Sequence, residues 1–406
     1  MTDDFQTKLR KLAELSVRFG LNIQPGQELF ISAPTAALQL VRLISEEAYK
    51  AGATAVIPFF ADDEITLAKF RSGSEAAIDH APAWLFEALG AQLKTGKTAR
   101  LAIAGDTPGL LADQDPGRVA RASRAQSTAS RPFLDAIVGN HTNWNIVPFV
   151  TPGWAAKVFA DDAPDAAEAR LWRHVFRATR VDQPDPVAAW RENFAELYRR
   201  RDALNAADFS ALHFTGGGTD LTVGLAAGHR WIGGGMTRGA GIEYAPNLPT
   251  EEVFTMPDRN RTQGRAVFTK PAAIAGTIVE GLVVEFSDGK ATRISADSGE
   301  EVARQYFTTD EGASRLGEVA LVSNSSPIAA SGTLFLNTLF DENAGCHIAF
   351  GNAYEMNLRE GVKDKAAMNK SQIHHDCMIG HAALDVTGMD RQGRQVPVMR
   401  GGEFVI

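Results

Sequence analysis

Cysteine is scarce in this sequence, since only Cys346 and Cys377 occur among its 406 residues. Two cysteines cannot build the disulfide framework of a small secreted protein, and such sparing use is typical of a reducing compartment. The sequence begins with the acidic Met1-Thr2-Asp3-Asp4-Phe5, and no apolar run follows a basic region there. We therefore expect no signal peptide and a cytoplasmic location.

Long hydrophobic runs and clusters of basic residues are also missing. No stretch of about 18 apolar residues occurs, so the sequence predicts no transmembrane helix. Lysine and arginine number 41 against 49 aspartate and glutamate residues, which gives a net charge of −8. Nucleic-acid-binding proteins usually carry a positive patch, and glycine does not recur here with the spacing of a phosphate-binding loop. We expect neither nucleic acid nor a membrane as a partner.

The first half of the chain alternates strands with helices. Apolar residues make up 44% of the sequence, which is enough for a large core in two or three domains. Apolar patterns predict strands at 27–32, 55–60, 100–105 and 144–149, and helices at 5–19, 36–50, 64–71, 83–89 and 117–130. This alternation favours an α/β domain with a largely parallel sheet and helices on both faces. Helical patterns continue over 162–208. We therefore place the end of this domain near Asp208, which gives a first domain of residues 1–208.

The second half has a different pattern, in which strands dominate. Short apolar stretches predict strands at 213–215, 221–223, 277–286, 291–295, 319–322, 385–387, 396–399 and 404–406. Clear helices are expected only at 299–307 and 313–316. Residues 209–406 therefore predict an α+β domain with mixed or antiparallel strands.

Residues with metal-ligand chemistry gather in this second half, between Pro249 and Gly380. They occur in five short stretches, at Pro249–Phe254, Gly317–Val319, Gly345–Gly351, Ala353–Tyr354 and His374–Asp376. Several carboxylates combined with two histidines suit a pair of divalent ions such as zinc, manganese or cobalt.

The spacing within His374-His375-Asp376 adds information. In an extended segment, residues i and i+2 share one face, so His374 and Asp376 would point at one site while His375 points away. Adjacent Glu251 and Glu252 would face opposite sides, so at most one of them ligates a given ion. The other would lie behind the ligands or act on the substrate.

Each candidate, taken alone, also has an ordinary structural explanation. The glutamates Glu251, Glu252 and Glu318 fit solvated loops or strand ends, and His374 and Asp376 fit a surface turn. His347 and Tyr354 fit a core in which backbone groups satisfy their polar atoms. The two cysteines neighbour these residues, but without a CxxC motif they are more often small packing residues than ligands.

At these residues the sequence resembles the thermophilic aminopeptidase family of metallopeptidases, to which aminopeptidases T and S belong. The resemblance covers essentially the whole chain. Its motifs are Lys11–Leu15, Thr142–Trp144, Pro152–Trp154, Ala178–Asp182, Gly218–Gly224, Asn247–Thr255, Leu339–Ala344 and His347–Gly351.

The resemblance implies six metal-site residues, which are Glu252, Glu318, His347, Tyr354, His374 and Asp376. It also implies a two-domain subunit, a homodimer and a dinuclear site enclosed in a cavity. Zinc is the first expectation for both ions, with cobalt, manganese or magnesium as alternatives. The segment between Tyr354 and His374 departs from the family pattern, because it is short and rich in lysine.

We therefore expect a metallo-aminopeptidase that hydrolyses the N-terminal bond of peptides with a free N-terminus, through a water that bridges two divalent ions. Glu318 or Asp376 is the candidate bridge between the ions. Glu251 is the candidate general base, and Tyr354 would stabilise the oxyanion as well as, or instead of, ligating.

Two other functions remain open at this point. Another dinuclear hydrolase, such as an amidohydrolase or a phosphoesterase, would use the same ligands, and Arg259, Arg261 and Lys370 are candidates for binding a phosphate. A metal-stabilised binding protein is the second alternative. Structural metal sites are usually rich in cysteine, so the carboxylates favour catalysis.

Overall fold

The computed structural model describes residues 3–239, 241–274 and 277–406. Its contacts divide the chain into two compact units, Met1–Trp190 with Gly235–Pro249, and Arg191–Gly234 with Thr250–Ile406. The expected change from helix to strand near Asp208 is present, because α9 (Pro186–Ala207) is followed by β5 (Ala211–Gly216). The contacts, however, separate the units after Trp190. Independently folding domains of residues 1–208 and 209–406 stay a prediction.

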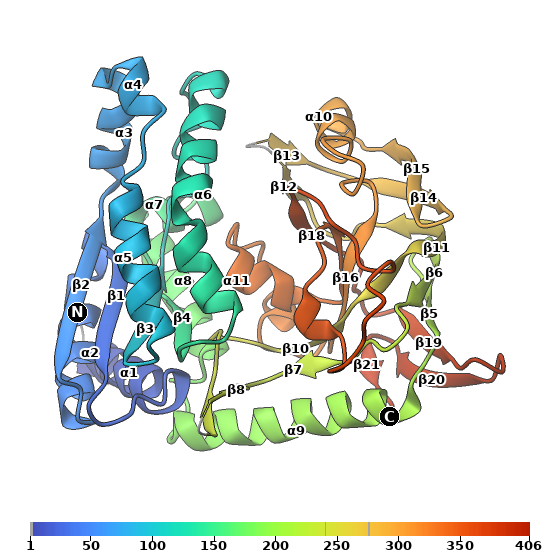
Figure 1. Cartoon of the computed structure of the whole chain (residues 1–406), viewed down its shortest axis with the longest axis horizontal. Helices are drawn as coiled ribbons and strands as arrows, with labels where there is room; N and C mark the ends of the chain where they lie inside the picture. Colours follow the sequence, from blue (N-terminus) through green and yellow to red (C-terminus); the bar gives the residue numbers. More distant parts are fainter. Residues whose placement is uncertain (1–2, 240, 275–276) are drawn as a thin grey trace. The chain divides into compact units, whose positions relative to one another are not determined.

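The first unit contains a parallel sheet of the predicted kind (Figure 1). Its strands lie in the order β2-β1-β3-β4, and every neighbouring pair is parallel. The bounds are β1 Glu28–Pro34, β2 Ala55–Ala61, β3 Thr98–Ala104 and β4 Trp144–Pro148, and the short strands β8 (Met236–Arg238) and β9 (Ile242–Tyr244) form a separate pair. From β1 the chain first adds β2 on one side of the sheet, and then adds β3 and β4 on the other side. Right-handed crossovers therefore put α2 on one face and both α5 and α6 on the other.

Helices connect these strands. Their bounds are α1 Asp3–Leu15, α2 Leu38–Lys50, α3 Asp63–Ser72, α4 Glu75–Ile78, α5 Ala83–Lys94, α6 Pro116–Val138, α7 Pro152–Val158 and α8 Pro164–Ala178. In Figure 1, α5 runs beside α6, and the two are in extensive contact. Among the described residues, no helix has both the length and the apolar character needed to cross a membrane.

The second unit is built from antiparallel sheets. One has five strands in the order β18-β17-β16-β10-β7, and the other has eight in the order β15-β14-β11-β6-β5-β19-β20-β21. The strands are β6 Thr219–Leu225, β7 Ile232–Gly233, β10 Glu252–Thr255, β11 Pro257–Val267, β14 Val283–Ser287, β15 Lys290–Ser295, β16 Leu316–Val322, β17 His347–Gly351, β18 His374–Met378, β19 Asp385–Met389, β20 Gln395–Arg400 and β21 Glu403–Phe404. A third, two-stranded sheet pairs β12 (Ala272–Ile274) with β13 (Thr277–Val279), and the helices are α10 (Glu300–Tyr306) and α11 (Thr338–Asp341).

Two predicted elements of this unit are wrong. The single strand expected at 277–286 is two strands, since β13 ends at Val279 and β14 begins at Val283. Gly281 lies between them with a φ of 62°, a left-handed conformation that ends an extended strand. The helix expected at 313–316 is a turn that leads into β16. There the Asp310 carboxylate accepts the backbone N–H groups of Gly312 and Ala313, and this Asx-type turn replaces the helical hydrogen bonds.

Candidate metal centre

The five-stranded sheet brings the predicted ligands together on one face. His347 lies opposite Ala320 on β16, and Glu318 lies opposite Ala349 on β17. On the other side of β17, Ala349 lies opposite Asp376 and Gly351 opposite His374. Glu252 lies opposite Val322, two residues beyond Ala320. Because side chains two residues apart share a face, Glu252, Glu318, His347, His374 and Asp376 all project from the same side of the sheet.

Small residues occupy the positions between these ligands. Ala320, Ala349 and Gly351 lie on the same face, and their lack of bulk leaves space above the sheet. Gly351 is also required by the backbone. Its φ is 99°, and a Cβ there would collide with the carbonyl oxygen of Ile373. The close approach of β17 and β18 at His374 therefore depends on glycine.

The opposite face of the sheet is a packed aromatic core. The Phe350 ring stacks on Phe307 and Phe286, with ring centroids 4.1 and 5.7 Å apart. His375 turns to this side, where its ring meets Tyr306 edge-on at 5.5 Å. His375 therefore points away from His374 and Asp376, as strand alternation predicts.

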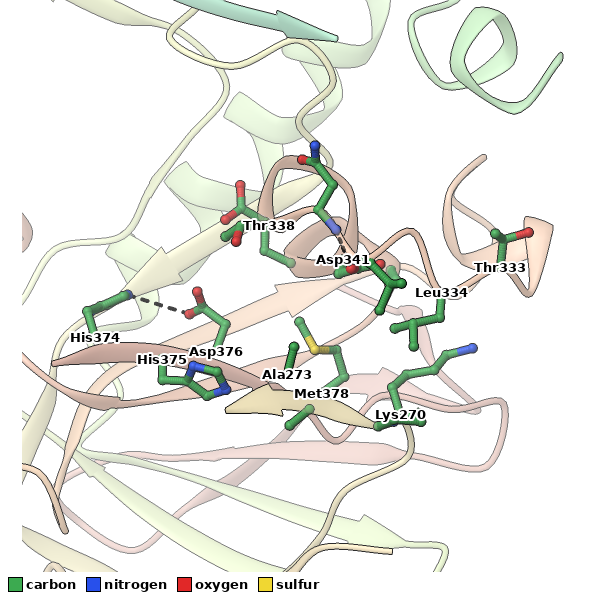
Figure 2. Close-up of a pocket in the computed structure, with 16 residues that line it drawn as sticks. Lys270, Ala273, Thr333, Leu334, Thr338, Asp341, His374, His375, Asp376 and Met378 are labelled. Carbon is green, nitrogen blue, oxygen red and sulfur yellow. Dashed lines mark hydrogen bonds and ion pairs between the residues drawn. The ribbon is translucent and has the colours of Figure 1, made fainter. Parts of the chain in front are cut away.

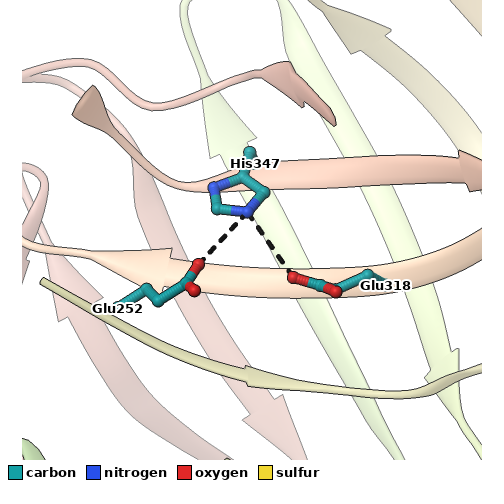
Figure 3. A group of neighbouring side chains, drawn as sticks. All are labelled: Glu252, Glu318 and His347. Atoms are coloured by element: carbon teal, nitrogen blue, oxygen red, sulfur yellow. Dashed lines mark ion pairs between the residues drawn. The ribbon is translucent and has the colours of Figure 1, made fainter. Parts of the chain in front are cut away.

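His347 lies at the centre of the buried part of the cluster (Figure 3). Its Nε2 is 3.4 Å from Oε2 of Glu252 and 3.6 Å from Oε1 of Glu318. One ligand atom from each of these three residues lies within 4.8 Å of the others, which is a spacing that one metal ion can span. Their side chains are nearly inaccessible to solvent, with relative exposures of 12%, 8% and 1% for Glu252, Glu318 and His347.

His374 and Asp376 complete the cluster on the other side of Glu318. Nε2 of His374 lies 3.5 Å from Oδ1 of Asp376, a contact drawn in Figure 2. The same Nε2 is 3.7 Å from Oε2 of Glu318. Glu318 therefore directs one carboxylate oxygen to each histidine.

Backbone carbonyl groups orient both imidazole rings. Nδ1 of His347 lies 3.1 Å from the carbonyl oxygen of Gly345, and Nδ1 of His374 lies 2.7 Å from that of Asn352. A proton on Nδ1 is donated to these carbonyls, which directs Nε2 towards the carboxylates. Histidines that bind metals usually have such a partner on the second nitrogen.

Burial and mutual charge shift the pKa values of the cluster strongly. Burial raises the pKa of Glu252 to about 8, and the nearby carboxylates of Glu318 and Asp376 add to this. Burial alone would lower the pKa of both histidines. The surrounding carboxylates outweigh it and raise the pKa of His347 to about 10 and that of His374 to about 9. The pKa of Asp376 is lowered, because His374 and His347 favour its ionised form against the effect of burial.

Of the two predicted catalytic residues, Tyr354 packs against this cluster, and Glu251 adjoins it in the chain, next to Glu252. The Tyr354 ring packs against the His374 ring with centroids 4.7 Å apart, and burial together with the carboxylates raises its pKa. Glu251 immediately precedes β10 and is buried. Its backbone N–H donates to Oδ1 of Asn343, which ties the start of β10 to the turn that contains Glu342.

Glu342 also belongs to the cluster, although the sequence did not identify it as a candidate ligand. Glu342 lines a pocket together with His374 and Asp376, and burial with the charges of Glu252 and Asp376 raises its pKa well above the ordinary value. Glu342 lies on a short 3-10 turn, Glu342–Ala344, where no strand or helix periodicity assigns a direction to a side chain. The signal that was available is the motif Leu339–Ala344, which the family resemblance had already singled out.

The donor set fits divalent cations. The carboxyl groups of Glu252, Glu318, Glu342 and Asp376 outnumber the two imidazoles, so the ionised cluster carries excess negative charge in a largely buried place. Oε2 of Glu252 is buried and, among the described residues, accepts no hydrogen bond. Buried anions of this kind are costly unless cations or hydrogen-bond donors compensate them. Oxygen and nitrogen donors in this ratio suit zinc, manganese, cobalt or magnesium.

The cysteines do not belong to this donor set. Cys346 lies beside Met399, with its sulfur 3.6 Å from Sδ, and burial raises the pKa of its thiol to about 12. Burial likewise raises the pKa of Cys377, which alternates with Asp376 on β18 and faces the aromatic core. Both thiols are therefore protonated packing groups.

A pocket of about 170 Å³ opens next to the cluster (Figure 2). Residues 374–376 and Glu342 line one part of it, and the rest is formed by residues 270–273, 333–334, 336–338, Asp341, Ala344 and Met378. All of these residues belong to the second unit.

The whole chain is similar to known proteins. A family model described as thermophilic metalloprotease (M29) matches residues 5–404. The chain is 48% identical to aminopeptidase T of Thermus aquaticus over the full length of both, and 40% identical to aminopeptidase 2 of Geobacillus stearothermophilus over 98% of each chain. The solved structure of wild-type AmpT from Thermus thermophilus is 45% identical and superposes with a TM-score of 0.95, covering 99% of this chain and all of that one.

Proposed function

The chain belongs to the thermophilic metalloprotease family M29 and is a metal-dependent aminopeptidase, and we propose that it cleaves the first peptide bond of its substrates at a site for two divalent ions. The observation that carries this proposal is the position of Glu318 between two histidines. Its Oε1 faces His347 and its Oε2 faces His374.

This geometry divides the candidate ligands into two sets that share Glu318. Glu252 and His347 form one set, because their closest atoms are 3.4 Å apart. His374 and Asp376 form the other, with closest atoms 3.5 Å apart, and Oδ1 of Asp376 also lies 4.0 Å from Nε2 of His347, which keeps Asp376 as the alternative bridge. A carboxylate with one oxygen in each set is suited to bridging two ions. We assign Glu342 as an additional oxygen donor from the facing turn and Tyr354 as a ligand or hydrogen-bond donor beside His374.

Zinc is the ion that we propose first. Its usual protein ligands are histidine nitrogen and carboxylate oxygen when cysteine is absent, as it is here. Manganese, cobalt and magnesium accept overlapping donors, so the choice among them follows affinity and supply. When bound, such ions lower the pKa of a water nucleophile and polarise the scissile carbonyl.

The chain's own residues supply the remaining chemistry. We propose that Glu251 accepts a proton from the attacking water and passes it to the departing amine. The Tyr354 hydroxyl keeps its proton at working pH, since burial raises its pKa, so it can donate a hydrogen bond to the oxyanion. A carboxylate of the cluster that the ions leave free would pair with the ammonium group of a free N-terminus, which favours an exopeptidase.

The cationic side chains argue against a phosphoesterase. Such an enzyme usually places arginine or lysine beside its ions to bind the phosphate. Of the candidates, Arg259 pairs with Glu311 at 2.8 Å, and Arg261 donates to the carbonyl oxygen of Leu225 at 3.3 Å. Both guanidinium groups are thus engaged elsewhere and Lys370 is exposed, so peptides remain the better substrate.

We also propose that the protein is a homodimer in the cytoplasm. β2 lies at an edge of the parallel sheet and exposes the large apolar side chains of Ile57, Phe59 and Phe60. An apolar edge strand is a typical site of association. Both cysteines are unpaired, which suits a reducing compartment. Light scattering on protein separated by gel filtration measures the mass of the particle, and a monomeric mass would refute the dimer.

One assay tests the function directly. The purified protein, treated with a chelator and then supplied with zinc, cobalt, manganese or magnesium, is tested on aminoacyl-p-nitroanilides and on the same compounds with an acetylated amine. We expect release of p-nitroaniline only from the free amines and only with metal. Cleavage of phosphoesters and not of anilides would overturn the proposal.

A further inference from the structure

The pocket beside the cluster begins at the proposed metal ligands and leads away from them. In the view of Figure 2, His374 and Asp376 lie at one end of the drawn residues and Lys270 at the other, with Ala273 and Met378 between them. Any group that fills the pocket is therefore next to the atoms that hold the ions.

The wall of the pocket is mainly apolar. Ala273 comes from β12, Leu334 from the loop that precedes α11, and Met378 from the end of β18. These elements enclose the space from different sides of the second unit. Apolar walls that lead away from a charged centre are typical of sites that bind a hydrocarbon side chain.

The size of the pocket limits what it can hold. Its volume is about 170 Å³. For comparison, an apolar cavity of about 150 Å³ in another protein binds benzene. The pocket therefore accepts a side chain up to about the size of a benzyl group, and it has no room for a continuing peptide.

We propose that this pocket binds the side chain of the substrate's N-terminal residue and makes the enzyme prefer medium-sized apolar residues such as leucine, methionine and phenylalanine. This inference rests on the proposed aminopeptidase function. The scissile carbonyl must lie at the cluster, and the first side chain is attached to the carbon next to that carbonyl. The pocket that adjoins the cluster is the place where this side chain fits.

Lys270 adds a charge preference at the far end. Lys270 lines the pocket and lies at the opposite end of the drawn residues from His374. The Asp341 oxygens accept the backbone N–H groups of Phe335 and Asn337 at 2.7 and 2.9 Å. Asp341 therefore holds the loop, and Lys270 disfavours lysine or arginine as the first residue.

The test fills the pocket from a position where a larger side chain can be accommodated. Ala273 is exposed on β12, so Ala273→Leu reduces the pocket without replacing a core residue. We expect the ratio of kcat/KM for phenylalanyl- to alanyl-p-nitroanilide to fall at least tenfold, because even one misplaced methylene changes selectivity by about 10- to 200-fold. Leu334→Ala enlarges the pocket and should raise the ratio for tryptophanyl over leucyl substrates.

The control is Ala206→Leu, which makes the same change at an exposed position of α9 outside the pocket. Its selectivity should equal that of the wild type. Equal losses on all anilides in Ala273→Leu, or a changed preference for the second residue of dipeptides, would overturn the assignment. Failure of the proposed function looks different, since the metal-loaded wild type would then cleave none of these substrates.

Discussion

Nε2 of His347 lies 3.4 Å from Oε2 of Glu252, although the two residues come from strands that β16 separates. β16, the strand between them, contributes Glu318, so side chains from three neighbouring strands meet in one place. A side chain at any of these positions is held by a sheet and not by a loop. Substitutions here should therefore change metal binding more than folding.

The metal stoichiometry tests the bridge. Glu318→Gln removes a charge from both proposed ligand sets, and we expect it to bind less than one ion per chain. Asp376→Asn removes the alternative bridge, which lies 3.5 Å from His374 and 4.0 Å from His347, and it should retain about one ion when Glu318 is the bridge. Elemental analysis of dialysed protein measures both values, with the circular dichroism spectrum as the check on folding. Two ions retained by Glu318→Gln would exclude Glu318 as the bridge.

Metal binding should depend on pH through the histidines. In the metal-free protein the pKa of His347 is about 10 and that of His374 about 9, so both imidazoles are protonated at pH 7. A metal ion binds the neutral ring, and binding therefore releases these protons and strengthens as the pH rises from 6 to 9. Calorimetry in buffers of different ionisation enthalpy counts the protons. If metal binding released no protons at pH 7, the raised pKa values of the two histidines would be contradicted.

The stability of the metal-free protein should change in the same pH range. A histidine whose pKa is raised by folding stabilises the native state at low pH and loses that contribution as the pH rises through its folded value. Glu252, with a pKa of about 8, acts in the same direction because folding favours its protonated form. We therefore expect the Tm of the chelator-treated protein to fall between pH 7 and 10, and that of the metal-loaded protein to fall less.

Glu251 and Glu252 should respond differently to the same substitution. We expect Glu251→Gln to keep its metal and to lose at least about 10²-fold in kcat, as removal of a general base does. Glu252→Gln should lose both metal and activity. Side-by-side metal content and turnover separate the two roles, and unchanged turnover in Glu251→Gln would exclude it as the base.

Tyr354→Phe tests the hydroxyl while keeping the ring that packs on His374. Loss of an oxyanion donor typically lowers kcat by about 10²- to 10³-fold, and KM should change little. A large loss of metal in this variant would instead indicate that the hydroxyl is a ligand.

Gly351→Ala and Gly361→Ala form a matched pair for backbone strain. Both glycines have positive φ, 99° and 83°, but an added Cβ meets Ile373 only at Gly351 and has open space at Gly361. We expect Gly361→Ala to lower the free energy of unfolding by about 1 kcal/mol and Gly351→Ala by about 3 kcal/mol, because the collision adds to the strain. Denaturant titration measures both values, and equal effects would contradict the collision.

The sequence predicts the strands better than the places where they stop. Alternation in His374-His375-Asp376 correctly assigns the direction of each side chain, because β18 is a regular strand. The strand at 277–286 is interrupted at Gly281, where a single left-handed residue outweighs an apolar pattern. Apolar patterns report burial and not the backbone conformation of one glycine.

Local sequence patterns predict some of the site residues but not others. Only the family resemblance selects Glu252 over Glu251 as the ligand. Their adjacent positions predict that the two side chains point in opposite directions, but not which one faces the cluster. Glu342 lies on a short turn, so its direction is decided by the contact of that turn with the start of β10 through Asn343. Contacts between segments far apart in the chain have no local pattern that could predict them.

The order of the strands in the five-stranded sheet also bears on how the enzyme is made. β18 lies at the edge of that sheet, and it is the last of the ligand-bearing strands to leave the ribosome. A chain that ends before His374 has the Glu252 and His347 side of the cluster but not the other side. A product truncated before His374 therefore lacks two of the proposed ligands, and we expect it to be inactive as a peptidase.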